Sequence, residues 1–161
     1  MIKRFNLLFI TLFSIGRIKY APGTFASLIT CGFFLLLNIF FNIPTIFFIS
    51  IIIFFYSIYA INNSYNSFSG SDPQEIVIDE SVGQLIPLLA IPVYETLCPL
   101  PIIYYCIASF LFFRLFDILK PFPINYIDRN TEGSIGIMLD DVVAGFFTII
   151  ILTIFFFYFG G

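Results

Sequence analysis

Long stretches without a charged side chain constrain this 161-residue chain more than any other feature. No charge occurs at positions 20–71, a single one at 81–113, and none at 142–161. These intervals match or exceed the roughly 20 apolar residues that cross a bilayer as one helix. We therefore expect an integral membrane protein.

The overall composition supports this expectation and excludes other classes. Only 11% of the residues are charged and 60% are hydrophobic, whereas soluble domains carry about 25% charged residues. The net charge of −3 argues against a nucleic-acid partner, which requires clustered Lys and Arg. The absence of histidine excludes hydrolases and zinc enzymes that depend on that side chain. The three cysteines lie in apolar stretches without a close pair, which indicates buried hydrophobes rather than disulfides.

Prolines divide the apolar intervals into helix-sized pieces. Asn42 and Pro44 interrupt the run 28–61 and predict two helices, and the prolines around Glu95 predict a hairpin within 81–113. The runs lack the alternation of barrel strands, so helices are the remaining way to satisfy the backbone in lipid. We predict an all-α, multi-pass membrane bundle of about four to five embedded helices, some short or kinked, forming one domain over 1–161.

The charges form three islands, at 3–19, 72–80 and 114–141. An even number of predicted crossings separates them, so all three should share one face of the membrane. The basic N-terminal residues place that face in the cytoplasm and the C-terminus opposite. The apolar run that follows Lys3 and Arg4 is too short to span, so we expect a retained helix that is interfacial or partly buried.

The second island is acidic. Asp72 is a suitable N-cap and Pro73 a suitable first helical residue, which would place Glu75 and Asp79 on one helical face with Glu80 turned by about 100°. A divalent cation such as Mg²⁺ would convert the repulsion among these acids into binding. The alternative is a solvated acidic helix start.

The third island combines acids with a cation. Asp117 and Lys120 are spaced for one helical face, and Asp140 and Asp141 open the final apolar helix. An N-cap explains one acid of the latter pair, but two acids beside a buried helix favour a functional role.

The first island contains a loop that suits a phosphate at a helix N-terminus, because it offers Lys19, Thr24 and Ser27 ahead of an apolar helix. The alternative is a capping turn with Thr24 or Ser27 as the cap. Together the islands indicate Mg²⁺-dependent phosphoryl chemistry on a lipid headgroup.

Five motifs in these islands resemble those of the phosphatidylglycerophosphatase A family over residues 16–146. They are Ala21-Pro-Gly-Thr24 with Ser27; Asp72-Pro-x-Glu75-Ile-Val-Ile-Asp79-Glu80 with Val-Gly83; Phe113-Arg-x-Phe-Asp117-Ile-x-Lys120-Pro121; Asp128-Arg129; and Gly136-Ile-Met-x-Asp140-Asp141-Val-x-Ala-Gly145.

The resemblance implies a bacterial inner-membrane enzyme that removes the terminal phosphate of phosphatidylglycerophosphate with Mg²⁺, on the cytoplasmic side. We expect the following site residues: Asp79, Glu80, Asp117, Asp140 and Asp141 in catalysis; Lys19, Thr24, Ser27, Lys120 and Arg129 on phosphate; and Asp72, Glu75, Asp79, Asp140 and Asp141 on metal. Family members often carry His-Gly-Gly where this chain has Glu132-Gly-Ser134, which leaves the general base unassigned.

A small cation transporter or channel is the main alternative, because acids within a membrane protein also bind ions. It requires charges inside the spans, whereas here they gather at span ends. A phospholipid synthase of the CDP-alcohol type is disfavoured because the chain has no Asp-Gly dipeptide. A membrane scaffold would leave the acid clusters without a purpose.

Overall fold

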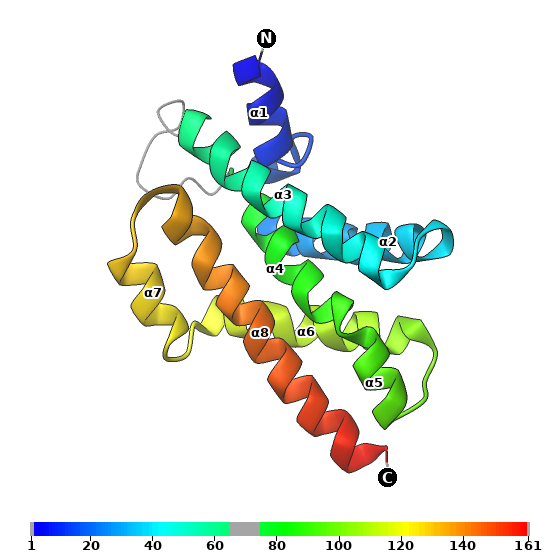
Figure 1. The fold of residues 1–161 in the computed structure, drawn as a ribbon. Coiled ribbons are helices and arrows are strands. Elements are labelled where there is room, and N and C mark those ends of the chain that lie inside the picture. The colour runs from blue at the N-terminus through cyan, green and yellow to red at the C-terminus, as the bar shows by residue number, and fades with distance from the viewer. Residues whose placement is uncertain (1, 65–74, 161) are drawn as a thin grey trace.

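A computed structural model describes residues 2–64 and 75–160, and all regular secondary structure in these ranges is helical, as predicted. The helices are α1 (Ile2–Ile10), α2 (Pro22–Phe40), α3 (Ile43–Ser64), α4 (Ile78–Leu89), α5 (Ile91–Leu97), α6 (Ile102–Leu119), α7 (Ile124–Asn130) and α8 (Gly133–Phe159), with a 3-10 turn η1 (Ile15–Arg17) after α1 (Figure 1).

Among the described helices, α2, α3, α6 and α8 are long and apolar enough to cross a membrane. The break between α2 and α3 falls where the sequence predicts it, because Asn42 accepts a hydrogen bond from the Thr45 amide at 3.1 Å and so caps α3. The hairpin expected around Glu95 also forms. There α4 and α5 follow one another with Pro87 and Pro92 near their junction, and α6 runs back after the turn at 98–101.

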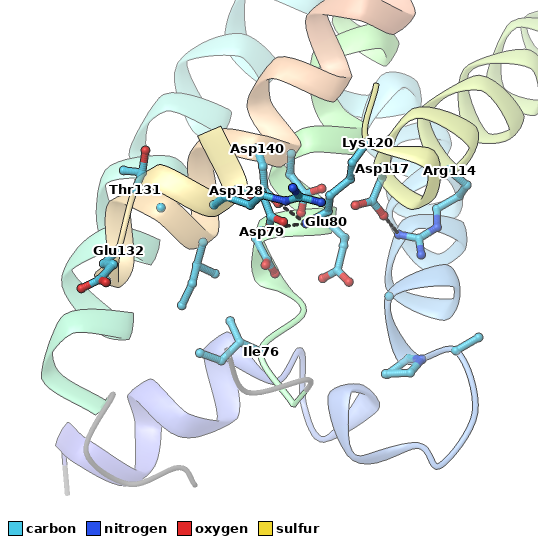
Figure 2. Close-up of a pocket in the computed structure, with 18 of the residues that line it drawn as sticks. Ile76, Asp79, Glu80, Arg114, Asp117, Lys120, Asp128, Thr131, Glu132 and Asp140 are labelled. Atoms are coloured by element: carbon cyan, nitrogen blue, oxygen red, sulfur yellow. Dashed lines mark hydrogen bonds and ion pairs between the residues drawn. The ribbon is translucent and has the colours of Figure 1, made fainter. Parts of the chain in front are cut away.

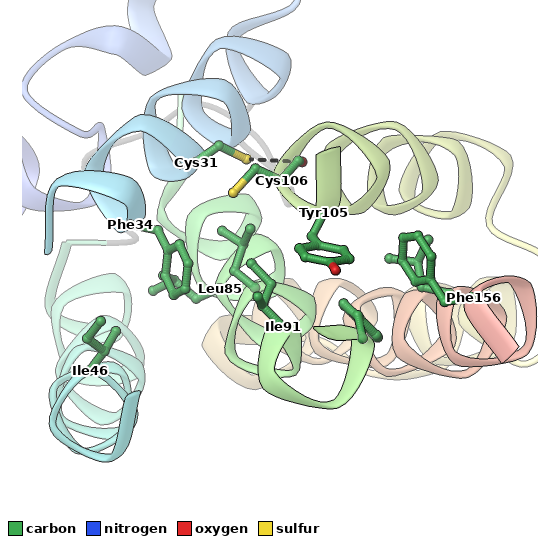
Figure 3. Packing of buried hydrophobic residues seen from close by; sticks show 11 residues of the cluster. Cys31, Phe34, Ile46, Leu85, Ile91, Tyr105, Cys106 and Phe156 are labelled. Atoms are coloured by element: carbon green, nitrogen blue, oxygen red, sulfur yellow. Dashed lines mark hydrogen bonds between the residues drawn. The ribbon is translucent and has the colours of Figure 1, made fainter. Parts of the chain in front are cut away.

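The helix α4 is the innermost of the bundle, since it packs against α2, α3, α6 and α8. The largest buried apolar cluster, shown in Figure 3, joins α2, α3, α4, α5, α6 and α8 through side chains that include Phe34, Leu85 and Tyr105. Cys31 and Cys106 are buried there as free thiols, in agreement with the sequence. A second apolar cluster, which includes Ile78, Val82 and Met138, packs the first turn of α4 against α8.

Two helix starts differ from the prediction. The helix α4 begins at Ile78 rather than at Pro73, so Glu75 and Asp79 do not share a helical face. The reason is a long-range contact: the Val77 amide donates to the Ile10 carbonyl at 3.0 Å, and Gly16 packs against the backbone of Glu75. Asp72 lies outside the described residues.

The final helix starts earlier than expected. It begins at Gly133, which has a left-handed φ of 76°, and Asp140 and Asp141 therefore lie about two turns inside α8 instead of at its N-terminus. In α2 the capping alternative is also wrong, because Ala21 is the N-cap residue and Ser27 donates to the Gly23 carbonyl at 3.0 Å.

Candidate active site

A cavity of about 930 Å³ opens where the starts of α2, α4 and α8 meet the end of α6 and the short helix α7. Its lining draws on all three charge islands, with Lys19 from the first island and, as Figure 2 shows, Glu80 and Asp140 from the second and third. The islands therefore share one end of the bundle, as the crossing pattern predicts.

Three carboxylates form the acidic centre of this cavity. One oxygen from each of Asp79, Glu80 and Asp141 lies within 4.8 Å of the others. Asp79 Oδ1, Glu80 Oε2 and Asp141 Oδ1 are buried without a hydrogen-bond partner. Asp79 and Glu80 are half-buried as whole residues, and Asp141 is buried.

Two glycines bring these acids together. Gly83 lies one turn after Asp79, and Gly145 lies one turn after Asp141. A Cβ on Gly145 would lie 2.6 Å from the Gly83 carbonyl oxygen, and one on Gly83 would lie 2.8 Å from the Asp141 carbonyl oxygen. Side chains at either position would separate α4 from α8, so the glycine contact sets the spacing of the acids.

The acidic centre fits a hard divalent cation. Buried carboxylate oxygens that lack partners are costly unless a positive charge compensates them, and oxygen ligands are those that Mg²⁺ prefers. Asp79, Glu80 and Asp141 supply such a set.

A guanidinium borders the acidic centre on the α6 side. Arg114 pairs with Asp117, three residues further along α6, and the two side chains are only 14% and 13% exposed. The Arg114 Nε atom has no hydrogen-bond partner, and Arg114 lines the cavity. Gly23 makes room for both groups, since a Cβ there would lie 1.9 Å from Glu80 Oε1 and 3.2 Å from Arg114 Nη1.

An ammonium borders the centre on the α7 side. Lys120 Nζ lies 2.5 Å from Asp128 Oδ1 and 2.7 Å from Asp140 Oδ2. Partial burial lowers the pKa of Lys120, but its hydrogen bonds to the two carboxylates outweigh that effect and raise it overall. One oxygen of Asp140, Oδ2, is therefore paired with Lys120, while its Oδ1 is buried without a partner. The adjacent Asp141 faces Asp79 and Glu80.

The remaining predicted site residues divide between the cavity and other places. Lys19 and Arg129 line the cavity. Ser27 is fully buried and hydrogen-bonded within α2, and Thr24 is not among the lining residues. Glu75 lines a second cavity of about 590 Å³, where its carboxylate lies 3.6 Å from Arg17.

Arg114 and Asp128 were missed as site residues by sequence reasoning. A signal for Arg114 existed, because it is spaced three residues before Asp117 and so shares its helical face. The partnership of Asp128 with Lys120 gave no local signal, since eight residues and a change of helix separate the two.

Comparison with known proteins agrees with this geometry. The family model for phosphatidylglycerophosphatase A matches residues 8–156. A Bacteroides thetaiotaomicron protein named "Putative phosphatidylinositol-3-phosphatase" is 35% identical over 88% of this chain and 87% of its own length.

Two relatives carry the family name itself. Phosphatidylglycerophosphatase A of Haemophilus influenzae is 34% identical over 87% of this chain and 82% of its own length. The Escherichia coli protein of the same name is 32% identical over 83% and 73%. No solved structure matches the chain. The chain is thus a multi-pass membrane protein that belongs to the phosphatidylglycerophosphatase A family of lipid phosphatases.

Proposed function

We propose that this protein is a Mg²⁺-dependent phosphatase that hydrolyses the terminal phosphate of phosphatidylglycerophosphate, giving phosphatidylglycerol and inorganic phosphate. The observation that carries the proposal is the union, in one cavity, of a buried acidic centre with flanking cations at the end of apolar helices. Two relatives named for this reaction support the choice of substrate.

In this proposal the acidic residues of the cavity bind the metal and the basic residues bind the phosphate. Asp79, Glu80 and Asp141 would hold Mg²⁺, which when bound would neutralise phosphate oxygens. Arg114 and Lys120 border this centre on opposite sides and would bind the phosphoryl oxygens that the metal does not reach. Asp117 would orient Arg114, while Asp128 and Asp140 would orient Lys120.

Two further cations extend the anion-binding rim. Lys19 and Arg129 line the same cavity from the η1–α2 loop and from α7, and neither has an acidic partner among residues 2–64 and 75–160. They would attract the anionic headgroup. Four basic residues in the first island support a cytoplasmic location for this face.

A second substrate also has specific support. The Bacteroides relative carries the name of a phosphatase for phosphatidylinositol 3-phosphate, which is likewise a phosphomonoester on a lipid headgroup. The cavity of about 930 Å³ is of the size that ligand sites commonly have. Only a direct comparison of the two lipids decides between them.

The test is phosphate release by purified, reconstituted protein from phosphatidylglycerophosphate, phosphatidylinositol 3-phosphate and phosphatidate, with Mg²⁺ or with a chelator. We expect the highest kcat/KM for phosphatidylglycerophosphate and no turnover in chelator. Asp141→Asn should abolish turnover, while Glu95→Gln, an exposed change on α5 outside the cavity, should retain it. If the protein prefers the inositol lipid, the proposed substrate is wrong. If it releases phosphate in the presence of chelator, the proposed metal requirement is wrong.

The transporter alternative predicts a different result. Metal uptake into protein-containing vesicles, absent from empty ones and without phosphate release, would support it. The described charges do not favour it, because the cavity gathers them at one end of the bundle rather than along a path through it.

A further inference from the structure

The helix α1 carries an apolar stripe that stays largely exposed in the described structure. Ile2, Phe5 and Leu8 are 70%, 58% and 46% exposed, and their spacing of three residues places them along one side of the helix. The other side is fixed to α3: Tyr56 donates to Asn6 Oδ1 at 2.9 Å, and the rings of Phe9 and Tyr56 lie 4.8 Å apart. The edge of the stripe reaches the same tyrosine, since the rings of Phe5 and Tyr56 lie 6.4 Å apart.

The length of α1 excludes a membrane crossing. Nine residues extend about 14 Å, whereas the hydrocarbon core is about 30 Å thick. The helix packs against α3, whose residues 43–64 form a candidate span, and it leads through η1 into the segment that lines the cavity with Lys19. The stripe is therefore placed near one boundary of the membrane.

The charges of α1 identify the surface that this stripe meets. Lys3 and Arg4 are exposed, and neither pairs with an acid among the described residues. An apolar stripe flanked by cations is the pattern of helices that lie in the headgroup layer of anionic membranes. Lys and Arg can bury their aliphatic stems while keeping their charges among the phosphates.

The far end of α1 is joined to the segment that leads into the acidic centre. The Ile10 carbonyl accepts the Val77 amide at 3.0 Å, two residues before Asp79, and the fully buried Ile10 belongs to the same apolar cluster as Ile76 and Ile78. A fixed position for α1 at the headgroup layer therefore also fixes the height of the α4 N-terminus relative to lipid.

We propose that α1 is an anchor that lies in the headgroup layer of an anionic leaflet, with Ile2, Phe5 and Leu8 among the upper acyl carbons and Lys3 and Arg4 among the lipid phosphates. Its partner is the lipid surface beside the cavity mouth. The placement does not depend on the proposed reaction, since the test below reads depth rather than turnover.

The chain has no tryptophan, so a single introduced indole reports on one position. Phe5→Trp and, as an independent second probe, Leu8→Trp are reconstituted in phosphatidylcholine bilayers with or without phosphatidylglycerol, and quenching by lipids brominated near the carbonyl or near the chain end is measured. Phe33→Trp, half exposed in the middle of α2, is the matched deep control.

We expect both α1 probes to emit at shorter wavelength than N-acetyltryptophanamide in buffer and to be quenched more by the shallow bromines, with the reverse order at Phe33→Trp. Phosphatidylglycerol should increase the quenching at Phe5→Trp, and adding Lys3→Gln and Arg4→Gln should remove that increase.

Three results would overturn the proposal. Water-like emission without quenching would place the stripe in solvent. Emission that shifts with protein density but resists every brominated lipid would mean that a second copy of the chain covers it. Equal quenching with and without phosphatidylglycerol would refute the role assigned to the two cations.

Discussion

At the scale of single residues, the three carboxylates of the acidic centre differ from the two cations that border it. Asp79, Glu80 and Asp141 form no ion pair among the described residues and each keep a buried oxygen without a partner, whereas Arg114 and Lys120 are each ion-paired with a neighbouring acid. Held cations lose little side-chain freedom when an anion arrives, and the free carboxylate oxygens remain available to a metal.

Replacing Arg114 tests the anion-binding role. Arg114→Lys keeps the charge but loses the planar donor fork, so we expect kcat/KM to fall by about 10²-fold with metal affinity retained. Arg17→Lys is the matched control, since Arg17 is largely exposed and lines only the second cavity. Steady-state kinetics and calorimetric Mg²⁺ titration measure the two effects, and unchanged kinetics for Arg114→Lys would remove it from the site.

The adjacent acids of α8 should behave differently when neutralised. Asp141→Asn removes a member of the acidic centre and should abolish Mg²⁺ binding, whereas Asp140→Asn leaves Lys120 held by Asp128 alone and should mainly raise KM with metal binding retained. Calorimetric titration with Mg²⁺ and substrate kinetics distinguish the two variants. Equal loss of metal binding in both would contradict this division.

The sequence indicates this site in outline but not in its division of roles. Successive helical residues point about 100° apart, so only one of Asp140 and Asp141 can face α4. Choosing between them requires the rotation of α8 about its axis, which the contact between Gly83 and Gly145 determines. That contact joins positions 62 residues apart, and the local sequence pattern of neither helix predicts it.

At the scale of helices, the packing of α4 against α8 positions the acids of the site. Its spacing depends on two glycines whose Cβ positions are already occupied by backbone of the opposing helix. Small residues allow membrane helices to approach closely, and here the close approach occurs one turn away from the acids.

Gly145→Ala should therefore disturb both the fold and the metal site. We expect about 1–3 kcal/mol of lost stability from overpacking, together with weaker Mg²⁺ binding. Gly32→Ala is the control, because no atom lies within 4 Å of its Cβ position and alanine is the better helix former. Thermal unfolding in detergent compares them; equal melting temperatures for the two variants would show that the glycine contact is not critical.

Local sequence rules predicted some helix boundaries correctly and others wrongly. The break at Asn42 was correctly predicted because the Asn42 side chain caps α3 locally, by accepting a hydrogen bond from the Thr45 amide three residues later. The start of α4 was not, because residues 75–77 are held by Ile10 and Gly16 from a distant part of the chain, and local capping rules contain no information about such contacts.

At the scale of the whole molecule, the arrangement of the spans predicts a membrane topology that cysteine labelling can test. Tyr20 lies at the cavity end and Tyr158 at the end of α8, and both are about three-quarters exposed. Tyr20→Cys and Tyr158→Cys, each in a Cys98→Ala background, should label from opposite sides of oriented vesicles with an impermeant maleimide. Labelling of Tyr20→Cys from the cytoplasmic side is the expected orientation; labelling of both from one side would refute the crossing pattern.

The central position of α4 separates the residues that contact lipid from the residues of the acidic centre. The helix that carries Asp79 and Glu80 is enclosed by α2, α3, α6 and α8, whose outward surfaces bear the exposed apolar side chains. Side chains on those outward surfaces can change without touching the helix that carries two of the three acids of the acidic centre. Adaptation to membranes of different acyl-chain length or fluidity is thereby open to substitution at the periphery, while the chemistry on the headgroup stays the same.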